Sequence, residues 1–163
     1  MSGIDWLLLF EQAETTGLGR IIRESMWLFP VIESVHLIGL ASLGGSVLAV
    51  DLRLLGLIFR EQPVAVVMRT ARPWFFASLG LMFATGIPLF LSEAVKCYFN
   101  TSFWVKMIAL ATAITFVFAV RNPLLGRQHT LAASCPAVNH VIGTASMGLW
   151  LTVAAAGRWI GFS

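Results

Sequence analysis

Charged residues are scarce in this chain of 163 residues, where they account for 12% of the composition against 58% for hydrophobic residues. A soluble domain of this length cannot bury so much apolar surface, so the expected solvent is the lipid bilayer. The length suits a single membrane domain, 1–163. Its arginines lie beside apolar runs, a pattern typical of membrane orientation, which argues against a nucleic-acid partner.

Several patterns of known chemistry are also missing from the sequence. It has no phosphate-binding glycine loop, no dinucleotide fingerprint, no CxxCH heme-attachment motif and no pattern typical of a Ser–His–Asp triad. The two cysteines, Cys97 and Cys135, fall in connections that the span count below puts on opposite sides of the membrane, which excludes a disulfide between them. No basic segment precedes the short apolar run 6–10, so we expect it to be retained rather than cleaved as a signal peptide.

Four apolar stretches predict membrane-spanning helices at about 26–50, 74–92, 103–120 and 139–160. About twenty helical residues, at a rise of about 1.5 Å each, cross the hydrocarbon core. Trp27, Trp74, Trp104 and Trp159 lie at the predicted span ends, where an amphipathic ring is favoured. The predicted fold class is therefore an all-α integral membrane four-helix bundle.

Two segments outside the spans are amphipathic. Residues 3–16 predict a short N-terminal helix that lies in the membrane interface, because it is too short to cross. Residues 61–72 form a basic amphipathic connection. Since the connections after the first and third spans hold most of the arginines, we expect them in the cytoplasm of a bacterial cell, with both termini on the outer, periplasmic side.

His36 is the leading candidate site residue. A histidine in the outer half of a span can be a heme or metal ligand, a proton-relay group, or a polar residue bonded to a neighbouring helix. Gly39 lies one turn farther along, and the small residues beyond it leave room for the edge of a porphyrin. A second histidine at matching depth is missing, because His140 enters the fourth span from the inner side and His129 lies in the inner loop. Other candidate second ligands are Met82, Met107 and the His36 of a second copy.

Glu33 and Lys106 have opposite charge and similar predicted depth, so they predict an ion pair between the first and third spans. The pair would either hold the helices in register or take part in proton movement or ligand binding. Glu33-x-x-His36 also matches the motif that di-iron bundles use twice, but one copy argues against a di-iron site.

Polar residues at the span ends offer weaker signals. Asp51 and Arg53 are two positions apart and do not face each other on a helix, so they are expected to act as interfacial anchors and as salt-bridge partners of other residues. His129, Cys135 and His140 are ligand types suited to zinc or copper, but their spacing matches no closed metal site.

Three runs of sequence resemble a family of uncharacterised bacterial four-helix membrane proteins that carries a domain-of-unknown-function label: ESVHLIGLASLGGSVLAVDLRLLG, WFFASLGLMFATGIPLFLSEAVKCYFNTSFWVKM and WLTVAAAGRWIGF. Through the His-x-x-Gly of the first span, the chain is more distantly similar to copper-resistance D-type membrane proteins. The resemblance covers the four spans but not the N-terminal helix. It implies that His36, Asp51, Arg53 and Lys106 are the positions that stand out.

Together these features predict a small membrane redox subunit, similar to a b-type cytochrome, that passes electrons between a quinone and an outer-face partner. His36 would ligate heme b, and Gly39 and Trp150 would line the cofactor. Copper handling by His36 and the methionines is one alternative, and a structural or assembly subunit without a cofactor is another. Whether the protein is an enzyme stays open. So small a chain is expected to work beside other membrane or outer-face redox subunits, or as a homo-oligomer.

Overall fold

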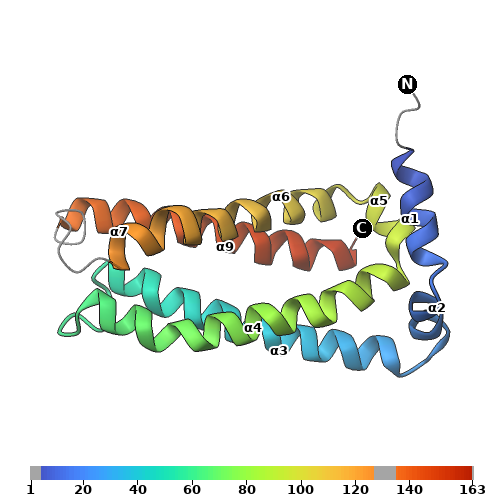
Figure 1. Ribbon diagram of the computed structural model, residues 1–163, viewed down its shortest axis with the longest axis horizontal. Coiled ribbons are helices and arrows are strands. Elements are labelled where there is room, and N and C mark those ends of the chain that lie inside the picture. The colour runs from blue at the N-terminus through green and yellow to red at the C-terminus, as the bar shows by residue number, and fades with distance from the viewer. Residues whose placement is uncertain (1–4, 127–134, 163) are drawn as a thin grey trace.

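The computed structural model describes residues 5–126 and 135–162, which form a bundle of four long helices with short helices across one end (Figure 1). No strand occurs among these residues. Each of the four long helices is apolar and long enough to cross a membrane. The predicted all-α bundle with four candidate spans is confirmed. The long helices are α3 (Leu28–Leu54), α4 (Val64–Ser92), α6 (Thr101–Phe116) with its extension, and α9 (Pro136–Trp159).

Successive long helices run in opposite directions along the bundle (Figure 1). α3 packs against α4, α6 packs against α9, and α9 closes the bundle against α3. α6 continues through a π-helical turn, η1 (Val117–Arg121), into α7 (Asn122–Gly126), and α9 ends in a 3-10 turn, η2 (Ile160–Phe162). α1 (Trp6–Glu14), α2 (Gly17–Glu24) and α5 (Ala94–Phe99) gather at the end where α9 finishes, which we call the capped end. The α3–α4 connection and α7 lie at the opposite end, the loop end.

The N-terminal region forms two helices where the sequence predicted one helix and a connection. The Thr16 side chain starts α2 by accepting a hydrogen bond from the Gly19 amide at 3.3 Å. α2 then buries Ile22 and packs on α4 at Gly19, where an added Cβ would overlap the carbonyl oxygen of Leu91. Residues 17–24 are therefore helical because one side of them fits against the bundle.

α4 begins well before the predicted start of the second span. Residues 64–73, expected to be part of a connection, are the first turns of α4, and the helix continues past Pro73 and Pro88. Val67 is buried in the bundle, which explains why these turns stay attached. Trp74 consequently lies within the helix and not at its end.

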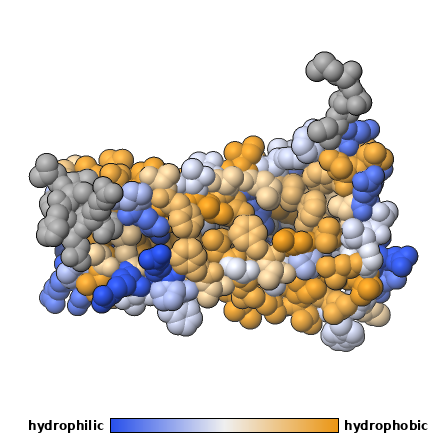
Figure 2. Space-filling model, in the orientation of Figure 1, coloured by the Kyte–Doolittle hydropathy of each residue, from blue (hydrophilic) through white to orange (hydrophobic). Residues whose placement is uncertain are grey.

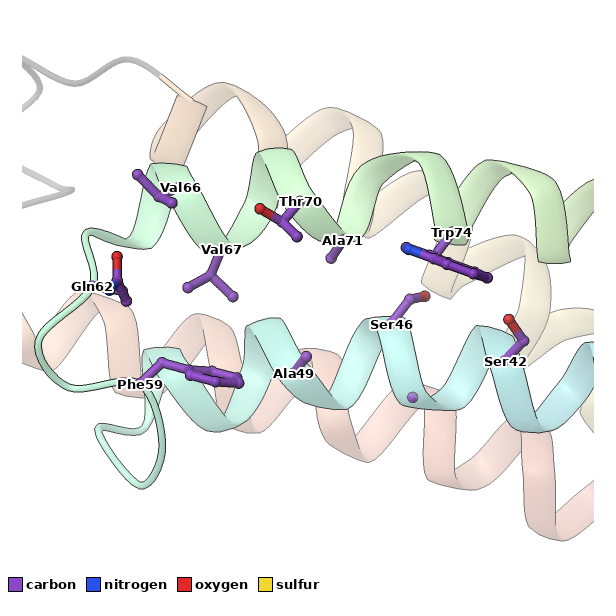
Figure 3. Close-up of a pocket in the computed structure, with 11 residues that line it drawn as sticks. Ser42, Ser46, Ala49, Phe59, Gln62, Val66, Val67, Thr70, Ala71 and Trp74 are labelled. Atoms are coloured by element: carbon purple, nitrogen blue, oxygen red, sulfur yellow. The ribbon is translucent and has the colours of Figure 1, made fainter.

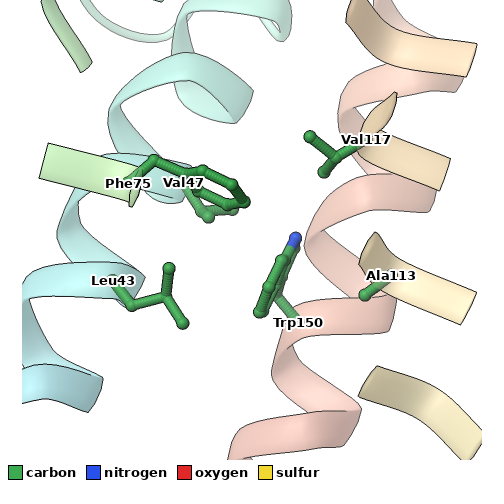
Figure 4. Close-up of a cluster of buried hydrophobic side chains, with 6 residues drawn as sticks. All are labelled: Leu43, Val47, Phe75, Ala113, Val117 and Trp150. Carbon is green, nitrogen blue, oxygen red and sulfur yellow. The ribbon is translucent and has the colours of Figure 1, made fainter. Parts of the chain in front are cut away.

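The interior contains two apolar clusters. Cluster A lies in the middle of the bundle (Figure 4) and consists of Leu43, Val47, Phe75, Ala113, Val117 and Trp150. Cluster B lies toward the loop end and consists of Val50, Leu54, Val67, Leu125 and Ile142. The face of the molecule in Figure 2 is also apolar along much of its length, whereas hydrophilic residues gather mainly toward the two ends. This distribution fits an integral membrane protein.

Candidate functional site

An apolar cavity of about 270 Å³ lies between α3, α4 and α6, and Val153 of α9 closes its inner wall. His36 and Lys106 are the titratable side chains among the described residues that line it. Met82 and Met107 line the same space. The structure therefore brings together His36, Lys106 and both of the candidate methionines, although these come from three different spans.

The His36 ring is held by α4. Its Nδ1 lies 2.7 Å from the Thr85 hydroxyl oxygen, and that oxygen lies 2.7 Å from the carbonyl oxygen of Leu81. A carbonyl only accepts, so the hydroxyl hydrogen belongs on the Leu81 side and Nδ1–H donates to Thr85. Nε2 is then the unprotonated nitrogen of the ring. Gly86 makes this position possible, because a Cβ there would lie 3.3 Å from His36 Cε1.

Lys106 reaches the cavity from α6 across Gly157, where an added Cβ would lie 3.7 Å from Nζ. No carboxylate in the described part of the chain lies within ion-pairing distance of Lys106. The predicted pair with Glu33 is not formed, and the prediction was wrong on this point. The two side chains face different ways: Glu33 is exposed on α3, whereas Lys106 is turned into the bundle and lines the cavity.

The other predicted cofactor residues lie in two different places. Gly39 is buried and lets the Met82 sulfur approach α3, since an added Cβ would lie 3.3 Å from Sδ. Trp150 does not line the cavity but belongs to cluster A, where it packs edge-to-face on Phe75 at 6.0 Å (Figure 4). Trp150 therefore does not line the same cavity as His36.

The part of the chain that the structure describes contains no group of three His, Cys, Asp or Glu side chains suited to a metal ion. Of the predicted loop cluster, His140 is exposed and Cys135 partly buried, while His129 lies outside the described residues. The predicted loop cluster therefore stays a prediction, and the candidate site is the cavity.

An ion pair lies deep in the bundle, and the sequence predicted neither its burial nor its second member. Asp51, expected as an interfacial anchor, is 0% exposed, and its Oδ1 lies 3.5 Å from Nη1 of Arg121, which is 5% exposed. Arg53, its neighbour in sequence, instead donates from Nε to the Gln62 carbonyl at 2.7 Å and so holds the α3–α4 connection. The sequence signal for this buried pair was spacing. On each helix, apolar residues recur at every fourth position, and Asp51 or Arg121 occupies the next position of that repeat.

α1 covers the capped end of the cavity. Phe10 packs on Phe90 and Phe103, both of which line the cavity, with ring centroids 5.4 and 6.3 Å apart. Glu14 fastens this helix, because it pairs with Arg23 at 2.6 Å and accepts a hydrogen bond from the Val95 amide of α5 at 2.7 Å. The N-terminal helices are therefore part of the bundle and close one end of its cavity.

A second hollow of about 470 Å³ lies between α3 and α4 near the loop end (Figure 3). Gly45 and Ala49 are among the small residues beyond Gly39 that were expected to leave room for a porphyrin edge, and they line this groove and not the cavity. Trp74 lies across one end of the groove and Phe59 at the other. Its described lining residues carry no titratable group, so it offers no group for acid–base or metal chemistry.

Comparison with known proteins gives one match. A family model described as a family of unknown function, DUF6644, matches residues 9–163. No curated protein and no solved structure matches the chain. The predicted membership of an uncharacterised family is confirmed, whereas the distant similarity to copper-resistance D-type proteins finds no support. The match covers nearly the whole chain, including α2 and the greater part of α1, and the protein therefore belongs to the DUF6644 family.

Proposed function

We propose that the protein is a small membrane redox subunit that takes a quinone from the lipid into the cavity at His36 and Lys106. The observation that carries the proposal is the pairing of one imidazole and one ammonium group in an otherwise apolar space. Pockets for small ligands have this character, with apolar walls and a few converging polar groups. The volume, about 270 Å³, suits the head group of such a ligand rather than a large macrocycle.

Access from the bilayer supports a lipid-soluble ligand. Phe83, Ile87 and Met107 line the cavity, and they are also 46%, 55% and 41% exposed on the bundle surface. The cavity thus reaches the lipid-facing surface of α4 and α6. A quinone can enter sideways with its isoprenoid tail left among the lipids.

The two polar groups complement a quinone at two of its oxygens. Lys106 Nζ carries only donors, so it suits a carbonyl or an anionic oxygen of the ring. His36 Nε2, as the unprotonated nitrogen, suits the hydroxyl hydrogen of the quinol form. In this proposal the chain binds and orients the head group, and electrons pass to a redox centre of a partner subunit.

Heme b is a second candidate, because a histidine that donates Nδ1–H to a fixed acceptor is the arrangement of a metal ligand. His36 would supply Nε2, Met82 or Met107 a thioether, and Lys106 a partner for a propionate. However, a porphyrin needs the walls of the cavity to move apart. Copper(I) would suit the same imidazole and thioethers, but the Lys106 ammonium group repels a bare cation.

Binding of a short-tailed ubiquinone to the protein in lipid nanodiscs tests the proposal. Lys106→Met should weaken binding about 10- to 100-fold, since a hydrogen bond to a charged group contributes roughly 1.5–3 kcal/mol. Lys96→Met is the matched control, because Lys96 is an exposed lysine on α5 that does not line the cavity. Equal losses in the two variants would refute the quinone site.

A visible spectrum and a metal analysis of the same preparation separate the candidates. A reduced-minus-oxidised α-band typical of heme b, lost in His36→Ala but kept in His140→Ala, would replace quinone with heme in this cavity. Copper bound in a ratio near one per chain, and lost in His36→Ala, would replace it with a metal site. Quinone binding without either signal supports the proposal as stated.

A further inference from the structure

A layer of polar residues separates the two apolar clusters. On α3, Asp51 lies one turn beyond Val47 of cluster A, directly after Val50 of cluster B and about one turn before Leu54 of cluster B. The same order occurs twice more, as Val117, Arg121 and Leu125 along η1 and α7, and as Trp150, Ser146 and Ile142 in reverse along α9. Three helices thus each place one polar residue at the same level, which we call the polar layer.

The π-helical turn explains how Arg121 comes to face inward. The buried residues along this helix recur at every fourth position: Ala109, Ala113, Val117, Arg121 and Leu125. In a regular α-helix such a series turns away from the interior by about 40° at each step, since a residue covers about 100°. η1 has more residues per turn, so it offsets part of this drift and keeps Arg121 on the inner face.

The polar layer has more hydrogen-bonding capacity than its own residues use. Asp51 and Arg121 share a single contact, and neither Asp51 Oδ2 nor Arg121 Nε has a hydrogen-bond partner among the described residues. The Ser146 hydroxyl is 0% exposed and lies beside the Asp51 carboxyl group, close enough to favour its charged form, but no described acceptor or donor lies within ordinary hydrogen-bond distance of it. Trp150 Nε1 is also buried without such a partner and points toward the level of Val117 (Figure 4).

We propose that the polar layer holds ordered water inside the bundle, with one molecule bridging Asp51 Oδ2 and Arg121 Nε. Water fits because it both donates and accepts: it would donate to the carboxylate oxygen and accept from the guanidinium N–H. A second molecule would accept from the Trp150 indole and bond the Ser146 hydroxyl. Buried waters ordinarily have two to four polar partners, and these four atoms from three helices supply them. This inference does not rest on the quinone proposal, because cluster A separates the layer from the cavity.

NMR of the protein labelled with ¹⁵N at arginine and tryptophan tests the proposal directly. The Arg121 Nε–H should show a cross-peak to water whose sign indicates a bound molecule with a long residence time. The peak should remain in Ser146→Ala, which removes the hydroxyl beside Asp51 that could relay the signal. Ser78→Ala is the matched control, because Ser78 is also buried but donates to the carbonyls of its own helix.

Two results would overturn the proposal. One is a wild-type Arg121 Nε–H that exchanges slowly and shows no water cross-peak, which means that the layer is dry. The other is a cross-peak that disappears in Ser146→Ala and persists in Ser78→Ala, which means that the hydroxyl alone produced it. If Ser146→Ala does not fold, density for a water between Asp51 Oδ2 and Arg121 Nε in a high-resolution crystal structure decides the question.

Discussion

The buried ion pair between Asp51 and Arg121 makes a quantitative prediction about stability. Removing one partner of a buried pair leaves the other charge uncompensated, which typically costs about 3–5 kcal/mol. Asp51 is 0% exposed and Arg121 is 5% exposed, so neither side chain can reach water at the surface when its partner is lost. We therefore expect Asp51→Asn and Arg121→Met each to lower the free energy of unfolding by about 3–5 kcal/mol.

The double variant should be no less stable than either single variant, because it leaves no charge unpaired. The coupling energy from the cycle of four proteins should then be at least about 3 kcal/mol, at or above the upper end of values for contacting residues. Reversible unfolding in mixed micelles, followed by tryptophan fluorescence, gives each of the four free energies. Comparison of the m-values checks that the substitutions leave the unfolding transition two-state.

The chain provides a control pair at nearly the same distance. Lys96 Nζ lies 3.6 Å from Glu93 Oε2, but the two side chains are 52% and 42% exposed. Exposed pairs contribute about 0–1 kcal/mol, so Glu93→Gln and Lys96→Met should show little coupling. If the Asp51–Arg121 coupling energy is as small as that of this control pair, burial does not determine the strength of the interaction and the reasoning is refuted.

Three further predictions follow from local contacts. Gly86→Ala places a Cβ 3.3 Å from the His36 ring and should lower ligand affinity about tenfold in a binding titration, whereas Gly80→Ala, with open space around it, should not. Glu14→Ala removes the side chain that bonds α1 to α5. The loss of about 1 kcal/mol of local stability should accelerate amide hydrogen exchange in residues 94–99 about fivefold. Unchanged exchange would mean that α1 is held by packing alone. Burial raises the pKa of the Cys97 thiol to about 11. In a variant with Cys135 replaced by serine, the alkylation rate of Cys97 should therefore be low at pH 8 and rise until the pH passes about 11. An alkylation rate that already reaches its plateau by pH 9 would contradict this.

The sequence was sufficient for the four spans because apolar runs of this length have few alternatives in a short chain. It was less informative at boundaries. Residues 17–24 and 64–73 are polar enough to look like connections, yet each buries one apolar side chain, Ile22 or Val67, against the bundle. Such packing depends on a partner helix far away in the sequence, and no local pattern encodes it.

The candidate site, like the helix boundaries, could be predicted from the sequence only in part. His36, Met82 and Met107 were chosen by residue type and depth, and they do line one cavity. The Glu33–Lys106 pair failed because depth says nothing about rotation of a helix about its axis. A single π-helical turn changes the rotation of the third spanning helix. It turns Arg121 toward Asp51, with which Arg121 forms an ion pair.

The cavity has consequences for how a ligand would compete for it. α1 closes it at the capped end through Phe10, while its side reaches the surface that contacts lipid. Occupancy would then depend on concentration in the plane of the bilayer and not on concentration in water. A tailless head-group analogue would compete poorly however well it matched His36 and Lys106, because little of it dissolves in the membrane, and tail length would tune potency independently of fit.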